Sequence, residues 1–413
     1  MNISVLILGA VFLLIAVRQV GRFRLRIWQI MTGGAVAALV TGAIAVPQAA
    51  ASVHPDVMLF LFGMFVVGHA LEDSGYLSHL SYALFTRARS TDQLVLLIIF
   101  GMGLGSAILM NDTLAIIGTP VVLHLAHRHG LSPRLVLLAL AFSITTGSVM
   151  SPIGNPQNFL IAVEGGMQNP FLAFFIPLAL PTLINLLMIY GFLRWMYPAE
   201  FHDIPLVHTR DPLSDPALAR LSRVSLALLI GGVVLKIMLG LAGWGDGFSP
   251  MWIALTAAAP VLLLSPRRLQ ILRELDWHTL AFFVAMFIVM ESVWESGFFQ
   301  SLLGGNDLDL KSDLVILLLG VVLSQFISNV PLVALYLPIL VLLQGDTGNL
   351  LALAAGSTIA GNLSILGAAS NVIIIQNAER KRGETLGFLE FARAGALLTG
   401  VQAGVYWLFL ARI

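Results

Sequence analysis

Two short polar segments stand out in a chain of 413 residues that is 58% hydrophobic. Both combine hydroxyl and amide side chains with prolines or glycines, a composition typical of a break in a helix. Hydroxyl, amide and carbonyl oxygens can bind a small cation or an oxygen-rich solute. The side chains that we single out are Ser151, Asn155, Gln157 and Asn158 in residues 145–158, and Thr358, Ser364, Ser370 and Asn371 in residues 356–371.

Two further polar motifs each lie between a pair of short apolar stretches. Asn111, Asp112 and Thr113 form the first motif, and Ser328 and Asn329 form the second. A carboxylate at bilayer depth is costly unless it is protonated or paired with a cation, so Asp112 is the main candidate for coupling to H+ or Na+. We therefore expect a coupling ion, but no other cofactor and no metal centre. The alternative is that these residues only cap and break helices.

Other kinds of chemistry have less support. The chain contains no cysteine, which excludes disulfides, thiolate metal sites and a cysteine nucleophile. It contains no HExxH, GxSxG or P-loop motif. His69 and Glu291 are secondary candidates for a proton relay, and a hydrated membrane edge explains the three histidines of residues 124–129 better than a metal does. We predict that the protein is not an enzyme, with an intramembrane serine hydrolase as the remaining enzymatic alternative.

The composition places these residues in a lipid bilayer. Only 11% of the residues are charged, against roughly 25% in soluble domains. Basic and acidic residues number 22 each, which gives no excess charge for nucleic-acid binding. A membrane span needs about 20 apolar residues. About ten stretches fit this requirement, near residues 3–17, 28–46, 56–71, 134–163, 171–193, 222–240, 251–265, 278–293, 350–376 and 386–410.

Residues 93–128 and 312–345 are predicted to be re-entrant hairpins, because each consists of two apolar limbs of about 15 residues, which is marginal for crossing a bilayer. If the hairpins do not cross, every Lys and Arg except Lys236, Lys311 and Arg412 falls on one side. Cytoplasmic loops collect basic residues, so we predict a multi-pass protein of the cytoplasmic (inner) membrane with both termini outside. The apolar N-terminal stretch is interpreted as a retained span, not a signal peptide.

The same order of parts occurs twice along the chain, at offsets that shrink slightly from one element to the next. The recurring residues include Phe60, Met64, Ser74 and Gly75 with Phe282, Met286, Ser296 and Gly297; Asn111 and Pro120 with Asn329 and Pro338; and Thr145, Ser151, Gly154 and Asn158 with Thr358, Ser364, Gly367 and Asn371. The hairpin tips match, the helix interruptions match, and these elements follow one another in the same order. Together these matches indicate an internal repeat.

We expect the first copy to cover residues 1–197, with its hairpin at 93–128 and its broken helix at 134–163. The second copy is expected to cover residues 222–413, with its hairpin at 312–345 and its broken helix at 350–376, after a cytoplasmic linker at 198–221. Because each copy has an odd number of crossings, the second copy is inverted in the membrane. The predicted fold class is an all-α polytopic membrane protein built from inverted five-span repeats, with about ten transmembrane helices, two re-entrant hairpins and two broken helices.

The hairpin tips and the broken helices that follow them resemble the ion transporter superfamily. The resemblance rests on Asn111-Asp112-Thr113 with Ser151-Pro152-Ile153-Gly154-Asn155-Pro156-Gln157-Asn158, and on Ser328-Asn329-Val330-Pro331 with Gly367-Ala368-Ala369-Ser370-Asn371. It covers essentially the whole chain and is greatest to the arsenite pump and sodium/proton antiporter branch, which includes permeases with a citrate-transporter-like domain. It implies a scaffold domain, a transport domain that moves like an elevator, and often a homodimer.

Dicarboxylate/sodium symporters of the same superfamily carry Ser-Asn-Thr at both tips. By that match, Asn111 and Asn329 would contact substrate and ions, and Ser328 would bind an ion. The hydroxyl residues of the pattern are replaced in this sequence by Met110, Asp112 and Val330. The loss of these hydroxyl groups, without a nearby Arg or Lys, argues against a di- or tricarboxylate substrate.

These features predict a secondary transporter of a small inorganic or organic solute that has the lipid bilayer, and no nucleic acid, as a partner. The predicted substrate-binding residues are Asn111, Thr113, Asn155, Gln157, Asn158, Asn329, Ser370 and Asn371, and the predicted ion-coupling residues are Asp112, Ser328, Ser151, Thr358 and Ser364. Proton-coupled export of arsenous acid is the leading hypothesis. The alternatives are a Na+/H+ antiporter, a sodium- or proton-coupled transporter of citrate or dicarboxylates, and a channel built on the same repeat.

Overall fold

The computed structural model describes residues 2–17, 19–20, 23–24, 26–76, 79, 88–201, 215–242, 249–298, 309–382, 384 and 386–412. These residues are almost entirely helical or in the short connections between helices. The exception is one antiparallel pair of two-residue strands, β1 (Gln19–Val20) and β2 (Phe23–Arg24). The all-α fold class predicted from the sequence is confirmed.

The helices follow the apolar stretches of the sequence, and many begin at a proline, whose missing N–H group is not needed in the first turn. In the first half they are α1 (Ile3–Val17), α2 (Ile27–Val40), α3 (Val46–Ala51), α4 (Pro55–Asp73), α6 (Thr91–Leu109), α7 (Asn111–His129), α8 (Pro133–Ser148), α9 (Pro156–Glu164), α10 (Pro170–Met196) and the 3-10 helix η1 (Pro198–Glu200). In the second half they are α11 (Pro216–Leu241), α12 (Pro250–Leu264), α13 (Arg268–Glu274), α14 (Trp277–Glu295), α16 (Asp313–Ile327), α17 (Asn329–Leu342), α18 (Thr347–Leu363), the 3-10 helix η3 (Ile365–Gly367), α19 (Ala369–Arg382) and α20 (Phe388–Leu410).

Some boundaries differ from those expected. The expected linker at 198–221 ends too late, because α11 already begins at Pro216, and residues 202–214 of that linker lie outside the described residues. The second expected span ends at Val40 and is followed by the separate helix α3. The short helix α13 was not predicted, because it is too short and too polar to register as an apolar stretch.

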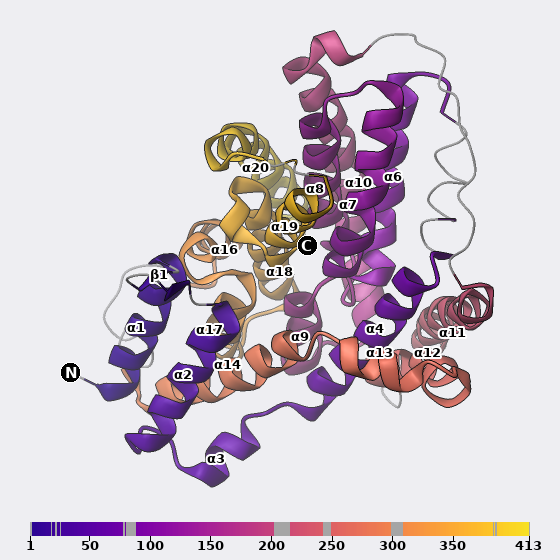
Figure 1. The fold of residues 1–413 in the computed structure, drawn as a ribbon. Coiled ribbons are helices and arrows are strands. Elements are labelled where there is room, and N and C mark those ends of the chain that lie inside the picture. The colour runs from indigo at the N-terminus through magenta and orange to yellow at the C-terminus, as the bar shows by residue number, and fades with distance from the viewer. Residues whose placement is uncertain are drawn as a thin grey trace.

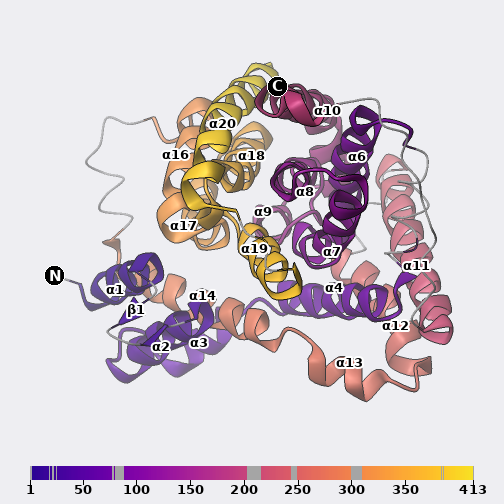
Figure 2. The ribbon, with the colours of Figure 1, turned by 45° about the horizontal axis from the view of Figure 1, so that its top comes forward.

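The two hairpins and the two broken helices form the centre of the molecule. Figure 2 shows α8, α9, α18 and α19 in the middle, with α6 and α7 on one side and α16 and α17 on the other. Helix α4 lies with α11, α12 and α13 along one part of the periphery, and α1, α2, α3 and α14 lie along another (Figure 1). The sequence-predicted site residues on the broken helices are therefore surrounded by protein.

Helix contacts recur between the two halves. Helix α6 packs on α8 as α16 packs on α18, and α7 packs on α19 as α17 packs on α9. In the same way, α4 packs on α12 and α14 packs on α2. The backbone at corresponding turns is also alike: Met110 and Ser328 both have a φ of 67°, and Gly75 and Gly297 have φ values of 70° and 72°. The same helices are thus used twice in the same order and with the same neighbours.

The described helices include five that are long and apolar enough to cross a membrane, namely α4, α6, α10, α11 and α14. Helix α6 is longer than the expected hairpin limb, because it extends from Thr91 to Leu109. Other apolar helices, among them α1, α2, α8, α12, α16 and α17, are shorter. Large apolar side chains are exposed on α10 and α11, including Phe175, Ile176, Leu180, Leu187, Val234, Leu235, Met238 and Leu241. Such surfaces are typical of contact with lipid.

Candidate solute- and ion-binding site

The first broken helix has both of its free ends capped by asparagines. Helix α9 begins at Pro156 after Asn155, whose side-chain oxygen accepts a hydrogen bond from the Asn158 N–H at 2.8 Å. The side-chain amide of Asn158 in turn donates to the backbone carbonyls of Ser148 and Ser151, in both cases at 3.1 Å. The last carbonyls of a helix have no partner within it, so Asn158 satisfies the end of α8 while Asn155 satisfies the start of α9.

The second broken helix uses the same device. The Asn371 amide donates to the carbonyls of Gly361 and Ser364, which correspond in the repeat to the two carbonyls bound by Asn158. Both asparagines are fully buried. The first role of each predicted asparagine is therefore to stabilise an interrupted helix inside the protein, which is the structural role that the sequence left as an alternative.

Thr358 on α18 joins the two broken helices. Its hydroxyl accepts hydrogen bonds from the Asn155 amide and from the Gln157 amide, both at 3.3 Å. It donates to the Asn158 side-chain oxygen, also at 3.3 Å. We call Thr358, Asn155, Gln157 and Asn158 the bonded set. These four predicted site residues are brought together across the two halves of the chain and satisfy one another.

The equivalent residues of the other copy do not satisfy one another. Thr145 corresponds to Thr358, and Ser370 and Asn371 correspond to Gln157 and Asn158, but Ala368 stands where the first copy has Asn155. The Thr145 hydroxyl, the Ser370 hydroxyl and the Asn371 side-chain oxygen have no hydrogen-bond partner among the described residues, although all three residues are at most 1% exposed. We call them the unpaired set. A buried polar atom without a partner costs about 1–3 kcal/mol, and a solute, ion or water bound at this set would offset that cost.

The tip of the first hairpin is attached to the first break. The Asn111 N–H donates to the Gly154 carbonyl at 2.9 Å, while the Asn111 side-chain oxygen is buried without a partner. Met110, just before it, has a positive φ, which is uncommon for a residue other than glycine and marks strained backbone. The Asn111 side chain is thus held next to the break with an acceptor still free.

Thr113 lies on the side of this tip that faces α4. A Cβ atom placed on Gly68 of α4 would lie 2.9 Å from the Thr113 side chain, so the two helices are in close contact there. Asp112 is half-buried in the first turn of α7. Within the described residues its carboxylate forms no hydrogen bond and no ion pair. Thr113 therefore faces a peripheral helix, and within the described residues neither Thr113 nor Asp112 has a side-chain hydrogen bond to the bonded set.

The remaining predicted residues make local contacts. The Asn329 side-chain oxygen accepts from the Val330 N–H at 3.0 Å and from the Ser328 hydroxyl at 3.4 Å. The Ser151 hydroxyl accepts from the Ile153 N–H at 3.3 Å, and the Ser364 hydroxyl donates to Gln325 at 2.7 Å. These bonds stabilise a turn or hold a break. Within the described part of the chain, none of these four side chains is hydrogen-bonded to a side chain of the bonded set, and the one link to it is the Ser151 carbonyl, which accepts from Asn158.

A second polar link between the halves was not predicted from the sequence. The Asn362 amide donates to the Thr146 hydroxyl at 2.9 Å and to the Gln402 side-chain oxygen at 2.8 Å. The Gln402 amide donates to the same Thr146 hydroxyl at 3.0 Å. Gln402 is a lone amide in an apolar helix, α20, and that isolation is the signal that would have found it.

Charge around this polar centre is low. Among the side chains of the described residues that are buried, Lys236 on α11 is the one that carries a charge, and α11 lies at the periphery (Figures 1 and 2). A separate cavity of about 280 Å³ opens between α14, α9 and α17 and is lined by residues that include His54, Glu164 and Glu291. No predicted substrate- or ion-binding residue lines this cavity.

Comparison with known proteins gives one family match. A family model described as a citrate transporter matches residues 10–349. An uncharacterized transporter of Mycobacterium tuberculosis (strain ATCC 25618 / H37Rv) is 27% identical over 375 residues, which cover 85% of this chain and 85% of the relative. The silicon efflux transporter LSI3 of Oryza sativa subsp. japonica is 27% identical over 431 residues, covering 84% of each chain. These relatives are named as transporters.

A solved structure shares the fold. The YdaH transporter of Alcanivorax borkumensis superposes with a TM-score of 0.59 over 100% of this chain and 98% of that chain, at 16% sequence identity. At this identity the likeness concerns the fold alone. It agrees with the multi-pass membrane architecture described above.

Proposed function

Because the chain belongs to the citrate transporter family, within the ion transporter superfamily that its motifs resemble, we propose that it is a secondary active transporter that exports a small hydroxylated inorganic acid in exchange for H+. Arsenous acid is the leading substrate, and silicic acid is the second member of the same chemical class. Both acids are largely uncharged near neutral pH and offer hydroxyl groups to amide and hydroxyl side chains.

The observation that carries the proposal is the chemistry of the unpaired set. In the part of the chain that the structure describes, Thr145, Ser370 and Asn371 present buried oxygens without partners, and the one buried basic side chain, Lys236, lies on the peripheral helix α11. A neutral hydroxylated solute would donate hydrogen bonds to these oxygens without introducing a net charge. A tricarboxylate such as citrate would bring charge into the same environment, which is costly without a cationic partner.

The similarity to a silicon efflux transporter supports this substrate class. Silicic acid and arsenous acid share small size, neutrality and several hydroxyl groups. The absence of cysteine from the chain means that arsenous acid would be recognised through hydrogen bonds and not through sulfur.

Asp112 is our candidate for the coupling proton. It lies at a hairpin tip, half-buried and without an ion pair among the described residues, so a proton or Na+ is the partner that it lacks. In this proposal the hairpins and broken helices move together past the peripheral helices, and the second copy is inverted in the cytoplasmic membrane, with both termini outside.

The match to a citrate transporter family favours a second candidate, a coupled transporter of citrate or another organic anion. Reconstitution into liposomes with an imposed pH gradient separates the candidates. We expect gradient-driven movement of arsenite or silicic acid and none of citrate. Citrate flux without movement of either inorganic acid would replace the proposal with the second candidate, and proton-coupled Na+ flux alone would make the protein a Na+/H+ antiporter.

A further inference from the structure

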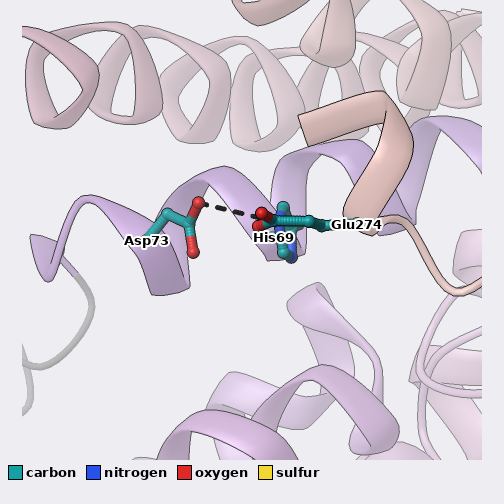
Figure 3. Close-up of side chains that lie close together, drawn as sticks. All are labelled: His69, Asp73 and Glu274. Atoms are coloured by element: carbon teal, nitrogen blue, oxygen red, sulfur yellow. Dashed lines mark ion pairs between the residues drawn. The ribbon is translucent and has the colours of Figure 1, made fainter. Parts of the chain in front are cut away.

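A cluster of three metal-ligating side chains lies outside the polar centre. His69 and Asp73 stand one turn apart on α4, and Glu274 reaches them from the end of α13 (Figure 3). One ligand atom from each residue lies within 4.8 Å of the other two. The spacing of four residues places His69 and Asp73 on the same face of one helix, and the unpredicted helix α13 supplies the third group.

The distances in this cluster fit shared ligation better than hydrogen bonding. His69 Nε2 lies 3.6 Å from an Asp73 carboxylate oxygen and 3.4 Å from a Glu274 carboxylate oxygen. Nε2 is buried and has no hydrogen-bond partner among the described residues. Two ligands of one tetrahedral Zn²⁺ ion, each about 2.0–2.1 Å from the metal, are about 3.3–3.4 Å apart. The nitrogen therefore lies from each of the two oxygens at almost the distance that separates two ligands of one ion, and all three atoms lie within 4.8 Å of one another.

The surroundings of Glu274 match those of a ligating carboxylate. The Gln270 amide donates to the other Glu274 oxygen at 3.1 Å, so one oxygen is held while the second points to His69. Ligating carboxylates are commonly oriented by such an outer hydrogen bond. The cluster also lies where a cation can reach it, because the Glu274 side chain is 48% exposed.

We propose that His69, Asp73 and Glu274 form a binding site for a divalent transition-metal ion such as Zn²⁺. One nitrogen and two carboxylate oxygens provide three ligands, and water provides the fourth, as in zinc sites that keep an open position. The bound ion would link the last turn of α4 to α13. This site is independent of the transport function proposed above, since it shares no residue with either polar set.

The test is zinc binding by the purified full-length protein in nanodiscs after treatment with a chelator. We expect saturable binding of Zn²⁺, and at least tenfold weaker binding in Asp73→Asn and in Glu274→Gln. Both substitutions are conservative and lie at partly exposed positions, so folding is not in question. Gln270→Ala should weaken binding about tenfold, because it removes only the outer hydrogen bond.

The matched control is His54→Gln. His54 pairs with one carboxylate, that of Glu164, at 2.7 Å and belongs to no three-residue cluster among the described residues, so zinc binding should be unchanged. Binding that survives in His69→Gln but is lost in His127→Gln would overturn the proposal and assign the ion to the histidines at the end of α7. Absence of saturable binding in the wild type would also overturn it and leave the cluster as a simple set of ion pairs.

Discussion

At the scale of single residues, Thr358 and Thr145 occupy equivalent positions but differ in their hydrogen bonding. We predict that Thr358→Val lowers the stability by about 1–3 kcal/mol, because amide groups of Asn155, Gln157 and Asn158 lose a buried partner. Thermal unfolding in detergent measures this effect. An unchanged unfolding temperature would show that these amides find other partners.

Thr145→Val is predicted to reduce solute flux without lowering the stability of the protein. The Thr145 hydroxyl has no hydrogen-bond partner among the residues that the structure describes, so its replacement by a methyl group should leave the unfolding temperature unchanged or raise it. Solute flux should fall at least tenfold, because the hydroxyl belongs to the proposed binding site. Flux equal to that of the wild type would exclude Thr145 from the site.

Asp215 gives a pH-dependent prediction outside the membrane-spanning segments. Its carboxylate accepts hydrogen bonds from the N–H groups of Leu218 and Ala217, both at 3.0 Å, and these bonds, aided by the Arg267 guanidinium, hold the pKa of Asp215 below its ordinary value. A carboxyl with a lowered folded-state pKa contributes stability above its unfolded pKa of about 3.9, and this contribution is lost as the pH falls through the folded-state pKa.

We therefore expect the wild type to lose more thermal stability between about pH 5 and pH 3 than Asp215→Asn, in which the amide still caps α11 but cannot titrate. Parallel melting-temperature curves for the two proteins over this range would contradict the assignment.

At the scale of elements, the packing of α8 on α6 depends on a glycine. A Cβ atom on Gly147 would overlap the backbone of Gly103. We predict that Gly147→Ala destabilises the protein by about 1–3 kcal/mol through overpacking and lowers its yield in the membrane. The matched control is Gly191→Ala on α10, where a Cβ atom would meet nothing within 4 Å. Equal stability of the two variants would mean that α6 and α8 can move apart without lowering the free energy of unfolding.

The helix breaks were predictable, but their hydrogen-bonding asymmetry was not. Asn155 followed by Pro156 is a local signal for a helix start, and the structure places the start of α9 there. Whether the hydroxyl of Thr358 or of Thr145 is hydrogen-bonded depends on side chains from the other half of the chain. It also depends on Ala368, whose methyl side chain cannot donate a hydrogen bond as the equivalent Asn155 side chain does. The sequence therefore indicates the right segments without indicating which of the two sets is free to bind a ligand.

At the scale of the whole molecule, the apolar stretches and the repeated motifs predicted the all-helical membrane fold, both hairpins and both breaks. The pair β1 and β2 and the helix α13 were missed, since elements of two to seven residues carry no clear hydrophobic period. The contact between α4 and the tip of α7 was missed as well. It depends on Gly68, whose importance is visible only when Thr113 is placed against it.

A proton on Asp112 is proposed to drive the movement of a neutral solute through the protein. The most direct measurement compares Asp112→Asn with the wild type in proteoliposomes, once as arsenite accumulation driven by a pH gradient and once as exchange of labelled for unlabelled arsenite without a gradient. Asp309→Asn, at an exposed carboxylate, serves as the control and should behave as the wild type does. We predict that Asp112→Asn abolishes gradient-driven accumulation and retains exchange, because only the coupling group is lost. Wild-type accumulation in Asp112→Asn would contradict the account.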